Sequence, residues 1–170
     1  MRRSTKSIGA LALLALVVSA GTAHAQRDAG AKLRGEYSFY GGAASSAMRS
    51  AQETSGYYRQ YAQTAPEKKV DADTAKEAAD TVGTYITKAQ AHLAGMRKHA
   101  AAAKDKATLT ALESIDKHLA AAKKSHDEMR ETCLKDTVNG AATLDCCKMI
   151  DDHLAKAIAE HDKLMKSLKK

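Results

Sequence analysis

Three stretches of the chain repeat an apolar or neutral residue at alternating intervals of three and four residues. This spacing places the repeated residues along one face of an α-helix and is typical of helices that pack side by side in a bundle. The sequence therefore predicts three long helices, each burying one stripe. The stripes comprise Ala75, Ala79, Val82, Ile86, Ala89, Leu93, Met96, Ala100 and Ala103; then Leu112, Ile115, Leu119, Ala122, His126, Met129 and Cys133; then Cys147, Ile150, Leu154, Ala157, His161, Leu164 and Leu168.

The composition favours helices along the whole chain. Alanine accounts for 35 of the 170 residues, whereas there is no tryptophan, one phenylalanine and one proline. Alanine is the best helix former, and the β-branched and aromatic residues that build sheets are sparse. Short polar connectors are expected at 104–106 and 136–143. We expect Pro66 in the first turn of the second helix, and Thr143 or Asp145 capping the fourth.

A further helix is predicted within residues 33–63, which hold five of the six tyrosines. Gly41 and Gly42 cost up to about 1 kcal/mol each in a helix interior, so we expect a break near them. The fold class is then all-α, an antiparallel up-down four-helix bundle. The alternative is a three-helix bundle with a flexible N-terminal arm. The stripe of this segment comprises Tyr37, Tyr40, Ala44, Ala47, Ala51 and Tyr58.

Residues 1–25 have the pattern of a secretory signal peptide: a basic start, an apolar run over residues 8–18, and a small-x-small cleavage site ending at Ala25. Cleavage would remove three basic and no acidic residues and lower the formal charge from +7 to +4. Such a mild charge in an exported protein argues against a nucleic-acid partner. No later apolar run reaches the ~20 residues of a membrane span, so no transmembrane anchor is expected after cleavage. We expect a periplasmic or secreted protein.

The predicted organisation has three parts. The signal peptide covers 1–25, a Gly- and Tyr-containing first helix or partly ordered arm covers 26–65, and the bundle core covers 66–170. Within the core, the helices at 108–135 and 144–168 resemble each other.

No enzyme signature is present in the sequence. There is no glycine-rich phosphate loop, no His-Glu-x-x-His and no nucleophile elbow, so neither a nucleotide cofactor nor catalysis is predicted. Ser125, His126 and Asp127 are consecutive and point about 100° apart on a helix, so they cannot form a triad. No Cys-x-x-Cys-His occurs, which excludes covalent haem.

Residues 115–129 and 150–164 match at eight of fifteen aligned positions. The matches include His118 with His153 and His126 with His161. Two explanations are open. One helix was duplicated together with its histidines, or the two helices look alike because bundle helices are built from few residue types.

The histidines suggest a metal site. If the last two helices turn about Asn139-Gly140, His118 lies level with His161, and His126 with His153. A turn near Asp105 brings His92 to the level of His118. Imidazole binds copper and zinc, and sulfur ligands favour Cu(I). The predicted ligands are His92, His118, His126, His153, His161, Met129 and Cys146.

The cysteines flank the predicted turn between the last two helices. In an oxidising compartment, Cys133 bonded to Cys147 or Cys146 would join the two helices, and we take Cys147 as the partner. The loop of about fifteen residues would make the bond worth roughly 3 kcal/mol. The third cysteine would be left for dimerisation or for a metal.

Two functions follow from these patterns. The first is a small exported bundle that stores or buffers copper or zinc. The second is a non-catalytic structural or protein-interaction module of the cell envelope with a disulfide-linked helical hairpin, contacting another envelope protein through its helices or its tyrosine-rich first segment.

Overall fold

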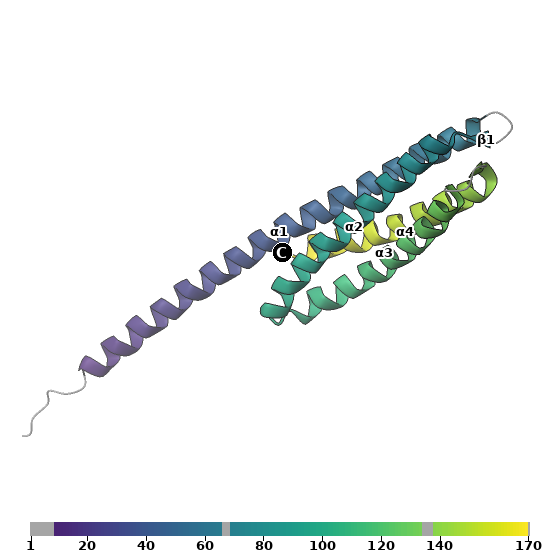
Figure 1. The fold of residues 1–170 in the computed structure, drawn as a ribbon. Helices are drawn as coiled ribbons and strands as arrows, with labels where there is room; N and C mark the ends of the chain where they lie inside the picture. Colours follow the sequence, from purple (N-terminus) through teal and green to yellow (C-terminus); the bar gives the residue numbers. More distant parts are fainter. Residues whose placement is uncertain (1–8, 66–68, 134–137, 170) are drawn as a thin grey trace, which may run out of the picture.

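The computed structural model describes residues 9–65, 69–133 and 138–169, with side chains described from residue 30 onward except at positions 69, 132, 133, 138 and 139. Within them the chain forms four helices that pack against one another (Figure 1). The helices are α1 (Gly9–Thr64), α2 (Ala72–Ala102), α3 (Lys106–Cys133) and α4 (Gly140–Ser167). The expected antiparallel four-helix bundle is confirmed, and the three-helix alternative is wrong.

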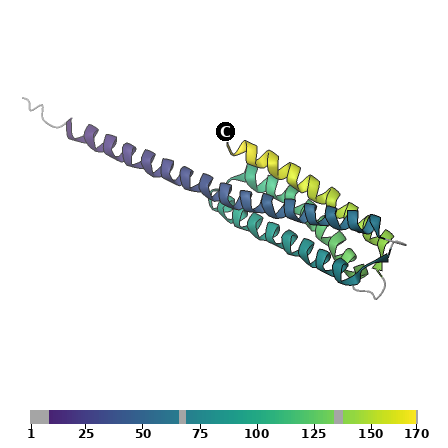
Figure 2. The ribbon, with the colours of Figure 1, turned by 90° about the horizontal axis from the view of Figure 1, so that it is seen from above.

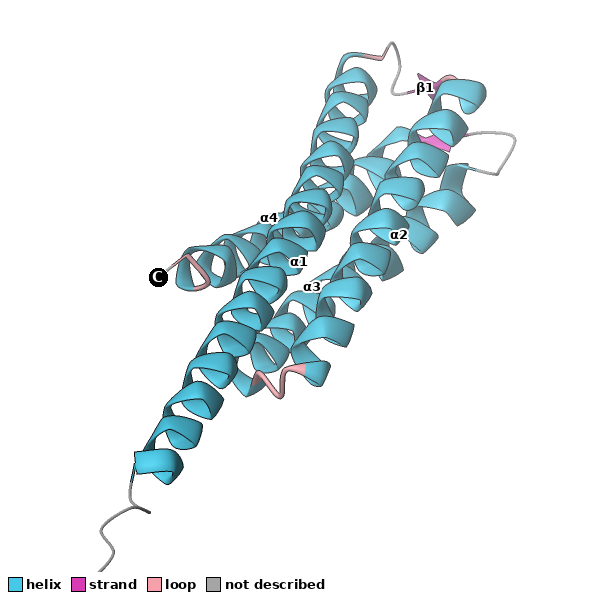
Figure 3. Cartoon of the chain, turned by 90° about the vertical axis from the view of Figure 1, so that its left-hand side faces the viewer, coloured by secondary structure: helices cyan, strands magenta, loops and turns pink. Residues whose placement is uncertain are grey.

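The order of packing follows the order of the chain. α1 contacts α2 and α4, and α3 contacts the same two helices. Figure 3 shows α1 and α2 side by side, with α3 and α4 behind them. Each helix therefore buries one face toward the other three, as the stripes require.

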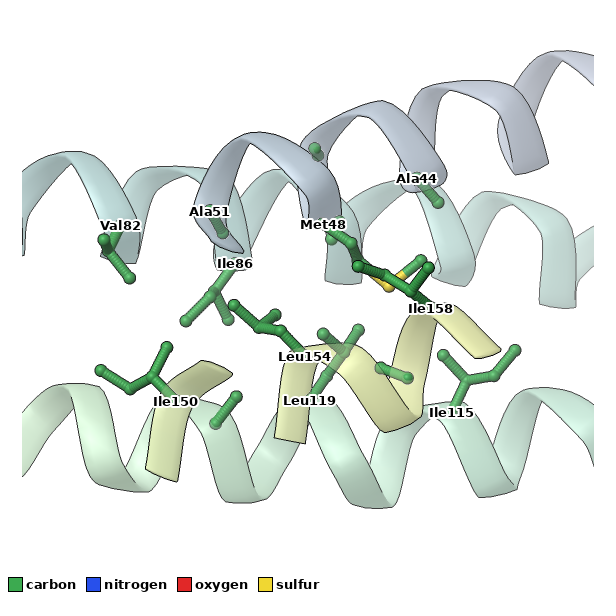
Figure 4. Close-up of a cluster of buried hydrophobic side chains, with 14 of the residues drawn as sticks. Ala44, Met48, Ala51, Val82, Ile86, Ile115, Leu119, Ile150, Leu154 and Ile158 are labelled. Atoms are coloured by element: carbon green, nitrogen blue, oxygen red, sulfur yellow. The ribbon is translucent and has the colours of Figure 1, made fainter. Parts of the chain in front are cut away.

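The centre of the bundle consists of the predicted stripe residues. Met48, Ile86, Leu119 and Leu154 come from four different helices and meet in the core (Figure 4). Every predicted stripe residue within α2 is buried, and Ala103, which follows the end of the helix, is exposed. Buried alanines lie between these larger side chains, and such small residues allow helix backbones to approach closely.

α1 is one continuous helix of 56 residues, so the break expected near Gly41 and Gly42 is wrong. Gly41 lies in the packed interface, where an added Cβ would meet the Met165 side chain. The buried stripe from Tyr37 to Ala62 outweighs the helix propensity that the glycines lack. Toward its N-terminus α1 runs past the α2–α3 connector and beyond the other helices (Figures 1 and 2).

The start of α2 differs from the expectation. The helix begins after Asp71, whose Oδ1 accepts a hydrogen bond from the Thr74 backbone N–H at 2.8 Å. Pro66, expected in the first helical turn, lies outside the described residues. The α2–α3 connector falls where it was expected, and the Asp105 carboxylate caps α3 by accepting from the Thr108 N–H at 3.0 Å.

Two short strands join the connectors at the opposite end of the bundle. β1 (Lys69–Val70) pairs antiparallel with β2 (Val138–Asn139), with Lys69 opposite Asn139. This pairing links the α1–α2 and α3–α4 connectors, which are far apart in sequence. α4 follows at once from Gly140, so Thr143 is a buried residue within the helix and not its cap.

Candidate functional site

The predicted metal site is not formed. Among the described side chains, no group of three or more His, Cys, Asp or Glu residues is placed to hold a metal ion. The interpretation of this chain as a copper- or zinc-storage bundle is therefore wrong. The seven predicted ligands lie in separate places, and the reason begins with the register of the α3–α4 hairpin.

The α3–α4 turn is centred about three residues earlier than expected, so each α3 residue faces a position about six residues earlier on α4, roughly 9 Å along its axis. Consequently His118 lies across from His153 and not from His161, with ring centroids 6.4 Å apart and planes tilted by 30°. Among the described side chains, this is the one pair of predicted histidine ligands whose rings lie against each other. Two imidazoles fall short of the three protein ligands that even an open zinc site uses.

His126 points from α3 to α2. Its Nε2 lies 2.8 Å from the Ala79 carbonyl oxygen, and its Nδ1 lies 3.1 Å from the Asp127 carboxylate. The ring packs against Gly83, where an added Cβ would lie 2.6 Å from ring atoms. Both ring nitrogens are therefore engaged, Nε2 in a contact that joins α3 to α2 and Nδ1 in a contact within α3.

His161 points from α4 to α1. Its side chain is 1% exposed, and within the described residues neither ring nitrogen has a hydrogen-bond partner. An added Cβ at Gly41 would lie 3.5 Å from its Nε2. Burial lowers the pKa of His161, because the charged ring would lose its hydration in the core.

The remaining predicted ligands are buried or half-buried residues of α2, α3 and α4. His92 is half-buried on α2. Met129 is buried with its Sδ 3.5 Å from the Cys147 Sγ, and Cys146 is also buried. The side chain of Cys133 lies outside the described residues, so the disulfide between Cys133 and Cys147 stays a prediction.

A different candidate site lies on the outer side of α1 and α2. A groove of about 390 Å³ runs between the two helices, and three tyrosines of α1 line it. Tyr58 is buried at its base, whereas Tyr57 is 70% exposed. Its remaining lining is mostly threonine and alanine, with one charged group, Glu77. We call Tyr57, Tyr58 and Tyr61 the tyrosine surface.

Two contacts hold the tyrosine surface in place. The rings of Tyr58 and Tyr61 lie 6.2 Å apart between centroids. The Tyr61 hydroxyl oxygen accepts a hydrogen bond from the Asp71 N–H, at 3.4 Å, beside the start of α2. Tyr58 and Tyr61 are thus held in place, and the tyrosine surface presents aromatic rings together with hydroxyl groups.

Part of this surface can be predicted from the sequence. The helical stripe placed Tyr58 in the core, and its neighbour Tyr57 then has to point outward. The other wall of the groove is formed by Thr74 and Ala78 of α2. Its position depends on the register between α1 and α2, which the spacing of residues within one helix does not predict.

Comparison with known proteins adds no assignment. No protein-family model, curated protein or solved structure matches the chain. Among the described residues, no helix combines the length and the apolar character that crossing a membrane requires.

Proposed function

We propose that this protein is an exported, non-catalytic helical bundle that binds another protein of the cell envelope through its tyrosine surface. The observation that carries the proposal is the exposure of Tyr57 beside a groove whose other two tyrosines are fixed. Tyrosine is enriched in protein interfaces, because it offers a large apolar face, a hydroxyl group and few rotatable bonds.

The charge distribution in the groove supports a protein partner. Apart from Glu77, its lining is uncharged, and the threonines supply hydroxyl donors and acceptors. Cores of protein interfaces are depleted of charge and surrounded by polar groups, which is the arrangement found here. Export rests on the signal-peptide pattern of residues 1–25.

The test places a photo-crosslinking amino acid at position 57 and, as a matched control, at position 39. Phe39 is also an exposed aromatic of α1, at 65% exposure, but it does not line the groove. We expect one discrete protein adduct from position 57 in envelope extracts and none from position 39. The adduct, once identified and purified, should bind the wild-type chain directly.

Binding of that purified partner is then compared between Tyr57→Ser and Phe39→Ser. Truncation of an interface tyrosine costs about 2 kcal/mol, so Tyr57→Ser should weaken binding by about thirtyfold. Phe39→Ser should leave it within about twofold. Equal effects of the two substitutions, or adducts with polysaccharide alone, would contradict the proposal.

A further inference from the structure

A second cavity, separate from the tyrosine surface, lies at one end of the bundle. At this end α1 extends past the other helices (Figure 2). Its volume is about 760 Å³, within the range of roughly 300–1,000 Å³ that small-molecule sites occupy. α1, the C-terminal end of α4 and the α2–α3 connector form its walls. The apolar part of the wall is made by Leu33, Met165 and Leu168, all partly buried.

Two basic residues in the lining of this cavity have no acidic partner among the described residues. Arg34 and Lys169 line it, both exposed, and neither forms an ion pair with a carboxylate among the residues that the structure describes. At the rim of an apolar cavity, two unpaired cations attract an anion more strongly than they would on an open surface.

The one acidic residue in the lining, Asp105, is already engaged. Its carboxylate accepts hydrogen bonds from the Thr108 hydroxyl at 2.7 Å and from the Tyr37 hydroxyl at 3.1 Å, besides the Thr108 N–H. Burial raises the pKa of Asp105, but these hydrogen bonds outweigh it, so the pKa lies below its ordinary value. Burial and the adjacent Asp105 raise the pKa of Tyr37 to about 12, so its proton stays on the phenol.

We propose that this cavity binds a free long-chain fatty acid. The carboxylate would lie between Arg34 and Lys169, and the acyl chain would pack against Leu33, Met165 and Leu168. A carboxylate gains charge-assisted hydrogen bonds from both cations, while the chain removes apolar surface from water. An anionic phospholipid in a membrane carries the same chemistry, so the test separates the two sources.

The test measures displacement of a dansyl-labelled fatty acid from the purified protein. Hexadecanoate should displace the probe, and hexadecanol, which lacks the charge, should do so about tenfold less well. The double variant Arg34→Gln/Lys169→Gln should weaken binding by more than about tenfold. Lys32→Gln, an exposed cation of α1 that does not line the cavity, should change it by less than about twofold.

Four results would overturn the proposal: no probe binding, equal displacement by acid and alcohol, equal effects of the double variant and Lys32→Gln, or binding to phosphatidylglycerol vesicles without binding to hexadecanoate. The last result would assign the basic rim to a membrane surface. Both substituted side chains are exposed, so we expect the variants to fold, which far-UV circular dichroism verifies.

Discussion

His126 and His161 occupy equivalent positions in the repeated segments of α3 and α4, yet their polar surroundings differ. Both are buried and both precede an aspartate. His126 has its Nε2 2.8 Å from the Ala79 carbonyl oxygen and its Nδ1 3.1 Å from Asp127. His161 has no hydrogen-bond partner among the described residues: the Asp162 Oδ1 lies 3.9 Å from its Nδ1, and the Asp162 Oδ2 pairs with Arg49 of α1 at 2.9 Å.

The difference arises from the neighbouring helix. Gly83 of α2 leaves room for the His126 ring to reach the α2 backbone, whereas at Gly41 of α1 the space is taken mainly by Met165. A repeated stripe therefore determines that a residue is buried, while the facing helix determines whether its polar atoms find partners. Hence His126 should stabilise the bundle and His161 should not.

The largest effect is expected from Gly83→Ala. The new Cβ would lie 2.6 Å from the His126 ring, which cannot move without losing its contact with Ala79. Overpacking and the lost hydrogen bond outweigh the gain in helix propensity, so the free energy of unfolding should fall by about 2 kcal/mol. Urea denaturation measures this change.

Two matched substitutions on α1 control that result. At Gly41 the obstructing group is the flexible end of Met165, so Gly41→Ala should stay within about 1 kcal/mol of wild type. Nothing lies within 4 Å of a Cβ at Gly42, so Gly42→Ala should stabilise by about 0.5–1 kcal/mol. A loss at Gly41 equal to that at Gly83 would remove the distinction between the two glycines.

Acid should destabilise the bundle through His161. Because burial lowers its pKa in the folded state, the unfolded chain binds the proton more readily below about pH 6.5. Stability should therefore fall as pH decreases through that value, by at most about 1.4 kcal/mol per pH unit for this one group. The measurement is the difference in unfolding free energy between wild type and His161→Leu from pH 8 to pH 5. A difference that stays constant would contradict the account.

The smallest effect is expected from Arg49→Met. Arg49 and Asp162 form an ion pair whose side chains are 53% and 42% exposed, so solvent screens it. The free energy of unfolding should change by less than about 0.5 kcal/mol. A loss above about 1 kcal/mol would mean that the ion pair between Arg49 and Asp162 stabilises the α1–α4 interface far more than its exposure indicates.

The stripes predicted the helices and their buried faces because packing of an apolar face depends mainly on spacing within one helix. They did not locate the α3–α4 turn, because the pairing of Val70 with Val138 joins two connectors that are distant in sequence. The resulting shift placed His118 against His153 and removed the expected metal site. The continuity of the helix at Gly41 could not be predicted for a similar reason, since the packing of Gly41 against Met165 depends on the α1–α4 contact.

The most direct test of the account compares His126→Leu with His161→Leu, two substitutions of the same chemistry at equivalent positions. His126→Leu removes the contact with Ala79 and should lower the free energy of unfolding by about 1 kcal/mol at pH 7.5. His161→Leu replaces a buried polar ring that lacks partners among the described residues, and it should leave stability unchanged or raise it. Losses of equal size in both variants would contradict the central claim.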